Sequence, residues 1–223
     1  MFIKDLKKLN LSIVALCIVE FVLCGWFFAA NHHYEGVVVA VNWFSGLGVQ
    51  FEINGLGILQ ALATSIIWVG SSVFSDEYFD HDKTYLHRYY AFFCVTFGAT
   101  LGIFLAYDLF TVFVFFEVMS FASYALVAHN QDADSIAAGN SYLTVAVLGG
   151  LVVLMGIFML NSIAGTLVIS QLQQACAPYV GTPAMYATGF MIFFGFAAKA
   201  GMFPLHGWLP KAHPAAPAPA SAA

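Results

Sequence analysis

Charged side chains are scarce in this chain of 223 residues: only 9% are Asp, Glu, Lys or Arg, whereas 61% are hydrophobic. A soluble domain typically carries about 25% charged residues. Too few charges remain here to cover a globule in water, so the apolar surface must face lipid or partner proteins. The composition therefore predicts an integral membrane protein.

The sequence also lacks the patterns of most ligand sites. Its seven Lys and Arg form no basic patch, so nucleic acid is not an expected partner. There is no phosphate-binding glycine loop, no catalytic-triad pattern and no Cys-x-x-Cys pair. We therefore expect no redox centre, cofactor, metal or catalytic residue in the chain, and interpret its cysteines as small hydrophobic residues. They are Cys17, Cys24, Cys94 and Cys176.

Long apolar runs are what the chain has in abundance. About six approach the roughly 20 residues that cross a bilayer as a helix. We predict an all-α fold, a polytopic transmembrane bundle of about six spanning helices. The first run follows three lysines, which leaves a signal peptide open, but it is longer than a signal core and contains Glu20. The predicted spans are Leu11–Ala30, Ile53–Ser75, Tyr89–Ala106, Leu109–Ala128, Ile136–Leu160 and Ala184–Phe203.

The basic residues predict the orientation of the bundle. With six spans, every Lys and Arg except Lys199 falls on one side, and the positive-inside rule assigns that side to the cytoplasm. Lys199 itself lies within the last predicted span. We therefore expect a multi-pass protein of the cell (inner or plasma) membrane with a cytoplasmic N-terminus. The residues that predict this are Lys4, Lys7, Lys8, Lys83, Arg88 and Lys211.

The connecting segments differ from the spans in character. Tyr34–Phe51 alternates somewhat and is interpreted as an external β-hairpin or an interfacial loop, and Leu167–Ala175 as a short amphipathic helix. The tail from Pro204 is rich in proline and alanine, so a broken helix is expected there. We divide the chain into residues 1–52, an N-terminal helix with an external loop, and residues 53–223, a transmembrane domain.

Glu117 is the first candidate for function, since it lies near the middle of the fourth predicted span. An ionised carboxylate at that depth costs about 2.5–3.5 kcal/mol or more. The group must be protonated, paired with a cation or exposed to water. Burial favours its neutral form and a nearby cation its charged form, so such a carboxylate can bind and release a proton. The alternative is a glutamic acid that hydrogen-bonds a neighbouring helix for packing.

Lys199 is the second candidate. A lysine and a carboxylate inside a membrane can form an ion pair that opens when a proton arrives. The alternative is a lysine that reaches the nearby interface with its long side chain. The small residues around it, Ala197, Ala198, Ala200 and Gly201, favour tight packing or water access over lipid.

Five further titratable residues are candidates for proton movement. His206 and His213 follow Lys199 in the broken segment, where imidazole could extend a proton path; ordinary interfacial histidines are the alternative. Glu20, Asp108 and His129 are weaker candidates. For Asp108 the competing interpretation is a helix cap, and Glu20 could instead meet a partner subunit.

Three segments resemble the proton-conducting, antiporter-like membrane subunits. They are Phe-Phe-Glu-Val-Met-Ser-Phe-Ala-Ser-Tyr (115–124), Lys-Ala-Gly-Met-Phe-Pro-Leu-His-Gly-Trp-Leu-Pro-Lys-Ala-His-Pro-Ala-Ala-Pro (199–217) and Phe-Glu-Ile-Asn-Gly-Leu (51–56). That family includes the large membrane subunits of respiratory complex I, of formate-hydrogenlyase-type and other energy-converting hydrogenases, and of Mrp cation/proton antiporters. The details look closest to the hydrogenase branch, although Asn54 stands where the family usually has Asp.

The resemblance implies roles for two residues and a limit to the chain. Glu117 matches the family's motif glutamate and Lys199 its paired lysine. Full members have about fourteen helices in two inverted five-helix repeats. This chain matches an incomplete first repeat, the N-terminal half only. The resemblance therefore implies a second polypeptide that supplies the remaining helices, or a truncated gene product.

Three functions follow from these observations. The first is a proton- or cation-translocating, non-redox subunit of a redox-driven complex of the NADH:quinone oxidoreductase or energy-converting hydrogenase type. The second is part of an Mrp-type cation/proton antiporter. The third is a structural fragment that does not conduct. In each, the expected partners are the lipid bilayer and other membrane subunits.

Overall fold

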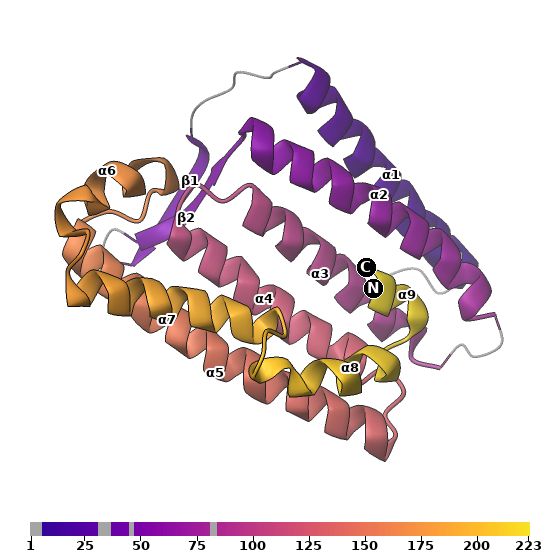
Figure 1. Ribbon diagram of the computed structural model, residues 1–223. Helices are drawn as coiled ribbons and strands as arrows, with labels where there is room; N and C mark the ends of the chain where they lie inside the picture. The colour runs from indigo at the N-terminus through magenta and orange to yellow at the C-terminus, as the bar shows by residue number, and fades with distance from the viewer. Residues whose placement is uncertain (1–5, 31–36, 45–46, 81–83) are drawn as a thin grey trace.

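The computed structural model describes residues 6–30, 37–44, 47–80 and 84–223. Lys4 and Lys83, two of the basic residues used to predict the orientation, lie outside the described residues. Figure 1 shows long helices packed side by side, with a small hairpin near one end. The elements are α1 (Leu6–Ala30), β1 (Val37–Phe44), β2 (Leu47–Glu52), α2 (Gly55–Tyr78), α3 (Leu86–Phe104), α4 (Leu109–Val127), α5 (Ala133–Ala164), η1 (Ile169–Gln171), α6 (Leu172–Cys176), η2 (Ala177–Tyr179), α7 (Pro183–Lys199), η3 (Leu205–Trp208), α8 (Leu209–Ala215) and α9 (Ala218–Ala222).

Four of the described helices, α1, α2, α4 and α5, are long and apolar enough to cross a membrane. The other two predicted spans form helices α3 and α7, of 19 and 17 residues. At 1.5 Å per residue these are about 28 and 26 Å long, close to the roughly 30 Å of a hydrocarbon core. The predicted all-α transmembrane bundle is confirmed, whereas the count of six spans stays a prediction.

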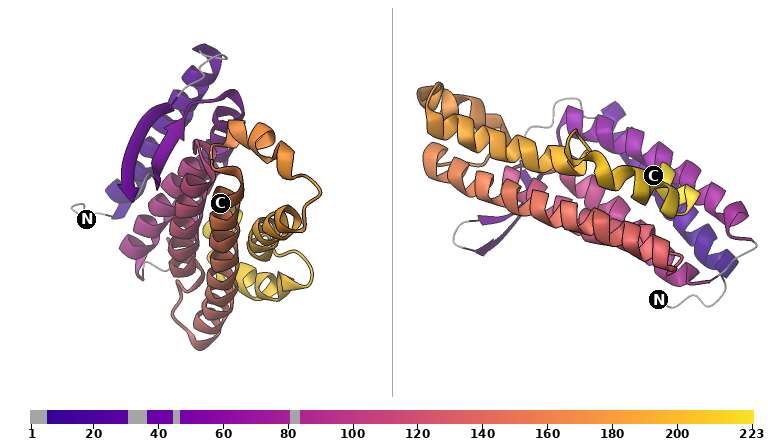
Figure 2. Two further views of the ribbon diagram at one scale, coloured as in Figure 1. Left: turned by 90° about the vertical axis from the view of Figure 1, so that its left-hand side faces the viewer. Right: turned by 60° about the horizontal axis from the view of Figure 1, so that its bottom comes forward.

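Each long helix packs against the next in the bundle. Helix α1 lies against α2, α3 against α4, and α5 against both α4 and α7. Figure 2 shows α5 and α7 running alongside one another, with the β-hairpin at the end away from α8 and α9. After α7 the chain turns back, so that α8 packs on α5 and α9 on α2. The predicted break is confirmed, and its pieces are short helices.

Polar side chains start four of the helices. At each start, a side-chain oxygen accepts a hydrogen bond from the backbone N–H three residues on, which has no partner inside the helix. These contacts explain why α2, α4, α5 and α7 begin where they do within apolar sequence. The capping residues are Asn54, Asp108, Asp132 and Thr182.

The predicted β-hairpin is confirmed, and it belongs to a larger set of backbone contacts. Strands β1 and β2 pair antiparallel. Glu52 N–H donates to Leu105 O at 2.8 Å, and Tyr107 N–H to Gln50 O at 2.9 Å. Leu109 N–H donates in turn to Leu167 O at 3.0 Å. We call residues 50–52, 105–109 and 167–169 the backbone seam; it joins three connections at one end of the bundle.

An aromatic core lies between α2 and α3. Tyr89 and Phe93 are fully buried, and Trp68 stacks on Phe97 with ring centroids 5.2 Å apart. The Phe79 ring meets Tyr89 edge-on at 4.7 Å. Such pairs add to the free energy of burying these large side chains. Aromatic packing therefore stabilises α2 against α3, on helices other than the one that carries Glu117.

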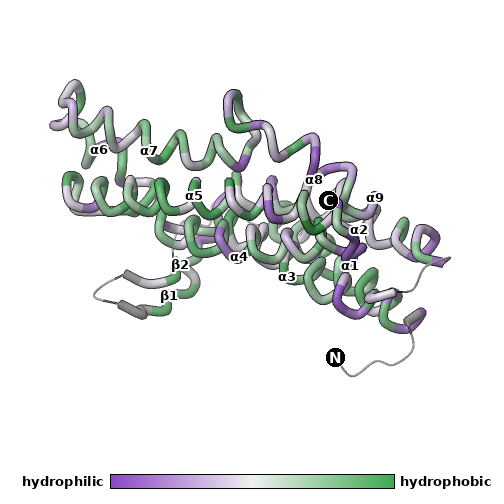
Figure 3. Tube along the Cα trace, turned by 90° about the horizontal axis from the view of Figure 1, so that it is seen from below, coloured by the Kyte–Doolittle hydropathy of each residue, from purple (hydrophilic) through white to green (hydrophobic). Residues whose placement is uncertain are grey.

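The outer faces of the bundle are strongly apolar. On α7 the side chains of Tyr186, Phe190 and Phe193 recur at helical spacing and are 67%, 63% and 58% exposed. Figure 3 shows hydrophobic residues along the middle of the long helices, and hydrophilic ones gathered near α8 and the adjacent ends of α1 and α2. An apolar girdle with polar ends is the surface that a bilayer requires.

The described basic residues used to predict the orientation lie at that polar end. Lys7 lines a small cavity beside Asp76 and Asp80. The Arg88 guanidinium donates to the His129 carbonyl at 2.8 Å, where α4 ends. Lys211 lines a cavity next to the start of α5. The geometry gathers these cations on one side, as predicted, and the assignment of that side to the cytoplasm remains a prediction.

Candidate functional site

Helix α4 presents Glu117 to α5. A Cβ atom added to Gly150 of α5 would collide with the Glu117 carboxylate, so the carboxylate occupies the space that a side chain would take. Its Oε1 atom is buried, and no group of the described residues hydrogen-bonds it. A buried oxygen in that state is costly for a carboxyl group, which makes this position unusual within the bundle.

The neighbouring glycine of α5, Gly149, packs closely against α7. A Cβ at Gly149 would lie 2.9 Å from the Gly195 carbonyl oxygen and 3.1 Å from Cβ of Ala198. A Cβ at Gly195 would collide with Val153 and with the Gly149 carbonyl. Small residues let helix backbones approach closely in a membrane. Consecutive glycines of α5 thus admit Glu117 from one neighbour and the backbone of α7 from another.

Lys199 is the last residue of α7. Gly201, two residues on, has φ +69°, a left-handed conformation that suits glycine and ends the helix. The Met202 N–H then returns to the Ala197 carbonyl at 3.0 Å, and the chain restarts as η3 at Leu205. The break therefore places the lysine beside irregular backbone, at the point where the helix stops.

The Lys199 ammonium points into the bundle. Its Nζ donates to Oγ of Ser120 on α4 at 2.6 Å. It lies 4.7 Å from the ring centroid of Phe116 and 5.8 Å from that of Tyr142, where the electron-rich ring faces attract a cation. Ser120, Tyr142 and Ala198 are all at least nine-tenths buried. Interfacial snorkelling does not describe this geometry.

Glu117 and Lys199 interact through space, and the ammonium hydrogen bond goes to Ser120. Ser120 follows Glu117 by three residues on α4, so the two side chains share a helix face about 5–6 Å apart. The structure brings the two predicted residues to one place. The direct Glu–Lys contact that the sequence suggested stays a prediction.

Three residues of this cluster were not singled out from the sequence. No sequence pattern marks Ser120, because any serine in an apolar helix can donate to a carbonyl of the preceding turn. Ser120 does so to the Phe116 carbonyl at 2.7 Å. The Tyr142 hydroxyl donates to the Ser120 carbonyl at 3.2 Å. The Trp208 indole N–H donates to the Ala198 carbonyl at 3.0 Å. Trp208 lies in the quoted 199–217 motif, which was the one available signal.

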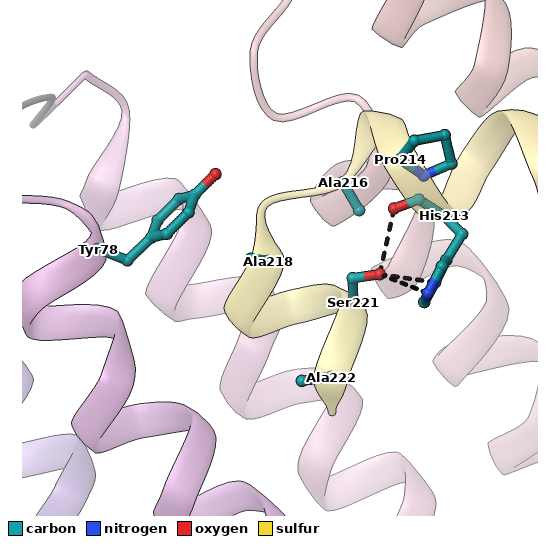
Figure 4. A pocket seen from close by; sticks show the side chains of 7 residues that line it. All are labelled: Tyr78, His213, Pro214, Ala216, Ala218, Ser221 and Ala222. Atoms are coloured by element: carbon teal, nitrogen blue, oxygen red, sulfur yellow. Dashed lines mark hydrogen bonds between the residues drawn. The ribbon is translucent and has the colours of Figure 1, made fainter.

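The two tail histidines lie elsewhere. His206 is exposed and its ring lies 5.6 Å from that of Phe203. His213 on α8 is also exposed, and the Ser221 hydroxyl lies 2.6 Å from its Nδ1. Figure 4 shows this contact among the residues, Tyr78 included, that line a pocket. The volume of the pocket is about 440 Å³. A role for either histidine in proton movement stays a prediction.

The weaker candidates have structural contacts. Asp108 is buried, and its Oδ1 accepts from Thr111 N–H at 2.7 Å, which is the helix cap named as its alternative. His129 is buried with its ring 5.4 Å from that of Tyr89. Glu20 is half-buried on α1, and Cys24 Sγ lies 3.7 Å from its Oε1. None of these contacts tests a role in transport.

The sequence matches a family model described as NADH:quinone oxidoreductase/Mrp antiporter, TM, over residues 106–223. The matched residues are more than half of the chain and contain both Glu117 and Lys199. The chain belongs to this family. The resemblance found in the sequence is therefore confirmed, and with it a multi-pass membrane protein.

The curated relatives of this chain include a hydrogenase component and antiporter subunits. The chain is 31% identical to hydrogenase-4 component B of Escherichia coli, over 85% of this chain and 28% of that protein. It is 30% identical to a putative antiporter subunit, mnhA2, of Staphylococcus haemolyticus, over 100% of this chain and 28% of the relative. With a Na(+)/H(+) antiporter subunit of Alkalihalophilus pseudofirmus the identity is 26%, over 95% and 43%. The chain spans less than half the length of these relatives.

Solved structures show the same fold. One is the membrane-bound sulfane sulfur reductase, an archaeal respiratory membrane complex, with a TM-score of 0.83 at 23% identity over 95% of this chain and 43% of that one. Another is the Mrp complex from Dietzia sp., with a TM-score of 0.79 at 24% identity over 96% and 40%. At these identities the likeness concerns the fold alone.

Proposed function

We propose that this family member translocates protons or another cation across the membrane as one subunit of a larger complex. The observation that carries the proposal is the buried cluster of Glu117, Ser120 and Lys199. A carboxylate and an ammonium at this depth are costly unless they serve an ion pathway or are tightly compensated. Within the part of the chain that the structure describes, Glu117 Oε1 has no hydrogen-bond partner, so its burial is incompletely compensated.

The proposed working of the cluster follows from its geometry. Lys199 carries a positive charge on a flexible stem at the end of a broken helix, and Glu117 offers a buried acceptor one turn from Ser120. A proton that reaches Glu117 neutralises the carboxylate and weakens its attraction for Lys199. Removal of that proton restores the attraction. Alternate protonation and deprotonation of Glu117 would give the transported proton an intermediate binding site inside the bundle.

Membrane vesicles that contain the complete complex test this proposal. Glu117→Gln and Lys199→Ala are each expected to lower ion transport by roughly tenfold or more, while the amount of the chain in the membrane is unchanged. Glu77→Gln and Lys211→Ala, which change exposed residues, are the matched controls. Normal transport in both site variants would support the non-conducting structural alternative.

Transport could be driven by a redox reaction or by a cation gradient, and the relatives include proteins of both kinds. Hydrogenase-4 component B fits a redox-driven complex, which is our first proposal, whereas relatives named as antiporter subunits fit an Mrp-type antiporter. Vesicles without an electron donor should show no proton movement when a sodium gradient is imposed if transport is redox-driven. Proton movement driven by that gradient alone would support the antiporter.

We further propose that other membrane subunits contribute helices to the complete transport route. Several relatives are named as subunits or components of larger assemblies. Co-purification of the affinity-tagged chain from native membranes, followed by mass spectrometry, should recover membrane proteins in fixed ratio to it. Recovery of the chain alone would contradict this part of the proposal.

A further inference from the structure

Lys199 belongs to a closed ring of contacts that crosses the helix break. On one side of the break its ammonium bonds Ser120 at 2.6 Å. On the other side, Trp208 donates to the carbonyl of Ala198, the residue before the lysine, at 3.0 Å. The Trp208 and Tyr142 rings lie 5.1 Å apart, and the Tyr142 hydroxyl returns to the Ser120 carbonyl at 3.2 Å. Elements α4, α5, α7 and η3 are joined in this way.

The Ser120 hydroxyl is oriented by a backbone carbonyl of its own helix. Its proton is directed to the Phe116 carbonyl at 2.7 Å, so an oxygen lone pair is left for the ammonium. Tyr142 holds the backbone of the same serine from the neighbouring helix. Hydrogen bonds to charged groups are stronger than those between neutral ones. Ser120 is thus a prepared acceptor for a positive charge.

A second acceptor stands beside it. Glu117 lies one turn away on the same face, and its buried Oε1 accepts no hydrogen bond from any residue in the described ranges. Among the described residues, the titratable side chains that face Lys199 are this carboxylate from α4 and Tyr142 from α5, whose ring centroid lies 5.8 Å from Nζ. The Lys199 ammonium therefore has two acceptors within reach: it bonds Ser120 in this structure, and Glu117 is the alternative.

We infer that Ser120, Tyr142 and Trp208 form a latch that holds Lys199 away from Glu117. Opening of the Trp208 contact, by movement of the segment after the break, frees the end of α7 and lets the ammonium reach the carboxylate. Trp208 and Tyr142 are positioning residues, since they act on Lys199 through Ala198 and Ser120. This inference rests on the proposed function, because it assigns the residues that set when the ion pair forms.

The pH profile of transport by the intact complex in vesicles tests the latch. Ser120→Ala removes the latch and lets the ammonium pair with the Glu117 carboxylate, which favours the charged amine, so the pH at which transport falls to half on the alkaline side should rise by about half a unit or more. Ser120→Thr, which keeps the hydroxyl, should restore the original profile. Tyr142→Phe, which loses the hydroxyl, and Trp208→Phe, which loses the indole N–H together with part of the ring, should move the profile the same way by less.

A double variant distinguishes a latch from independent packing defects. Contacts in one network couple, whereas separate sites add. Trp208→Phe should therefore cause little further shift when Ser120 is already alanine. Tyr186→Phe and Trp26→Phe, at exposed positions, are the matched controls and should leave the profile unchanged.

The results separate the two proposals. Unchanged profiles in all latch variants, or additive shifts, would overturn the latch while loss of transport in Lys199→Ala still supports the proposed function. Normal transport in Lys199→Ala would overturn the function itself. If Ser120→Ala fails to reach the membrane, the Ser120→Thr, Tyr142→Phe and Trp208→Phe profiles still decide.

Discussion

At the scale of single residues, the site depends on positions that are small or hydroxylated. The cost of burying a charge drew attention to Glu117 and Lys199 in the sequence, and the structure places both in one cluster. Gly150 makes room for the carboxylate, yet one glycine among 19 offers no signal that predicts this. Its importance comes from a neighbour on another helix.

Gly150→Ala should impair transport more than folding. The added methyl group must displace the Glu117 carboxylate, the end of a movable side chain, and so leaves the backbone in place. We expect transport to fall by roughly tenfold, or about 1.4 kcal/mol in barrier height, at normal membrane abundance. Gly98→Ala is the control, because nothing lies within 4 Å of the added atom. Equal transport in both variants would show that the carboxylate position is unimportant.

Asp132 predicts a pH dependence outside the membrane. Hydrogen bonds from the Ser135 backbone N–H, at 2.6 Å, and from its side chain hold the pKa of this exposed carboxyl below its ordinary value. A lowered pKa in the folded state means that the cap stabilises α5 at neutral pH. That contribution starts to fall below about pH 4, where the unfolded chain takes up the proton, and is lost as pH drops through the folded pKa.

Thermal unfolding in detergent, followed by circular dichroism, measures this effect. At neutral pH, Asp132→Ala should unfold at a lower temperature than the unmodified chain, and the difference should shrink as the pH is lowered below about 4. Asp134→Ala, in the first turn of the same helix, is the control and should show a smaller difference. A difference that persists in acid would mean that the cap does not depend on the carboxylate charge.

At the scale of the elements, the close approach of α5 and α7 positions the lysine. A Cβ at Gly195 meets backbone and a buried valine, neither of which can move aside cheaply. Gly195→Ala is therefore expected to destabilise the bundle by about 1–3 kcal/mol. Gly189→Ala, on the same helix with open space around it, should not. Midpoints of unfolding in detergent give the comparison, and equal midpoints would argue against tight α5–α7 packing.

The sequence predicted elements better than contacts between them. Proline, glycine and polar caps act locally, so the break after Lys199, the hairpin and the start of α4 beside Asp108 could be predicted. The Gly98 and Gly102 pair shows the limit: a Cβ at Gly102 would collide with Phe115, while Gly98 faces open space. A pattern names a possible packing face, and only the partner helix decides which residue uses it. Ser120 and Tyr142 escaped prediction for the same reason.

At the scale of the whole molecule, the polar ends and apolar sides imply a fixed topology. In a Cys176→Ser background, Lys8→Cys and Lys211→Cys should react with a membrane-impermeant maleimide only from the cytoplasmic side. Val180→Cys, at a residue that is 73% exposed between α6 and α7, should react only from the opposite side. Labelling of all three from one side would contradict the predicted spanning of α7 and the orientation.

The backbone seam has a consequence for how this molecule can change over generations. Its bonds join main-chain atoms of residues 50–52, 105–109 and 167–169, and main-chain atoms are common to every amino acid except for the missing N–H of proline. Substitutions can therefore accumulate along this edge without loosening it. We expect the backbone geometry of the seam to persist in relatives whose sequence there has changed completely. The buried contacts around Ser120 should tolerate few substitutions.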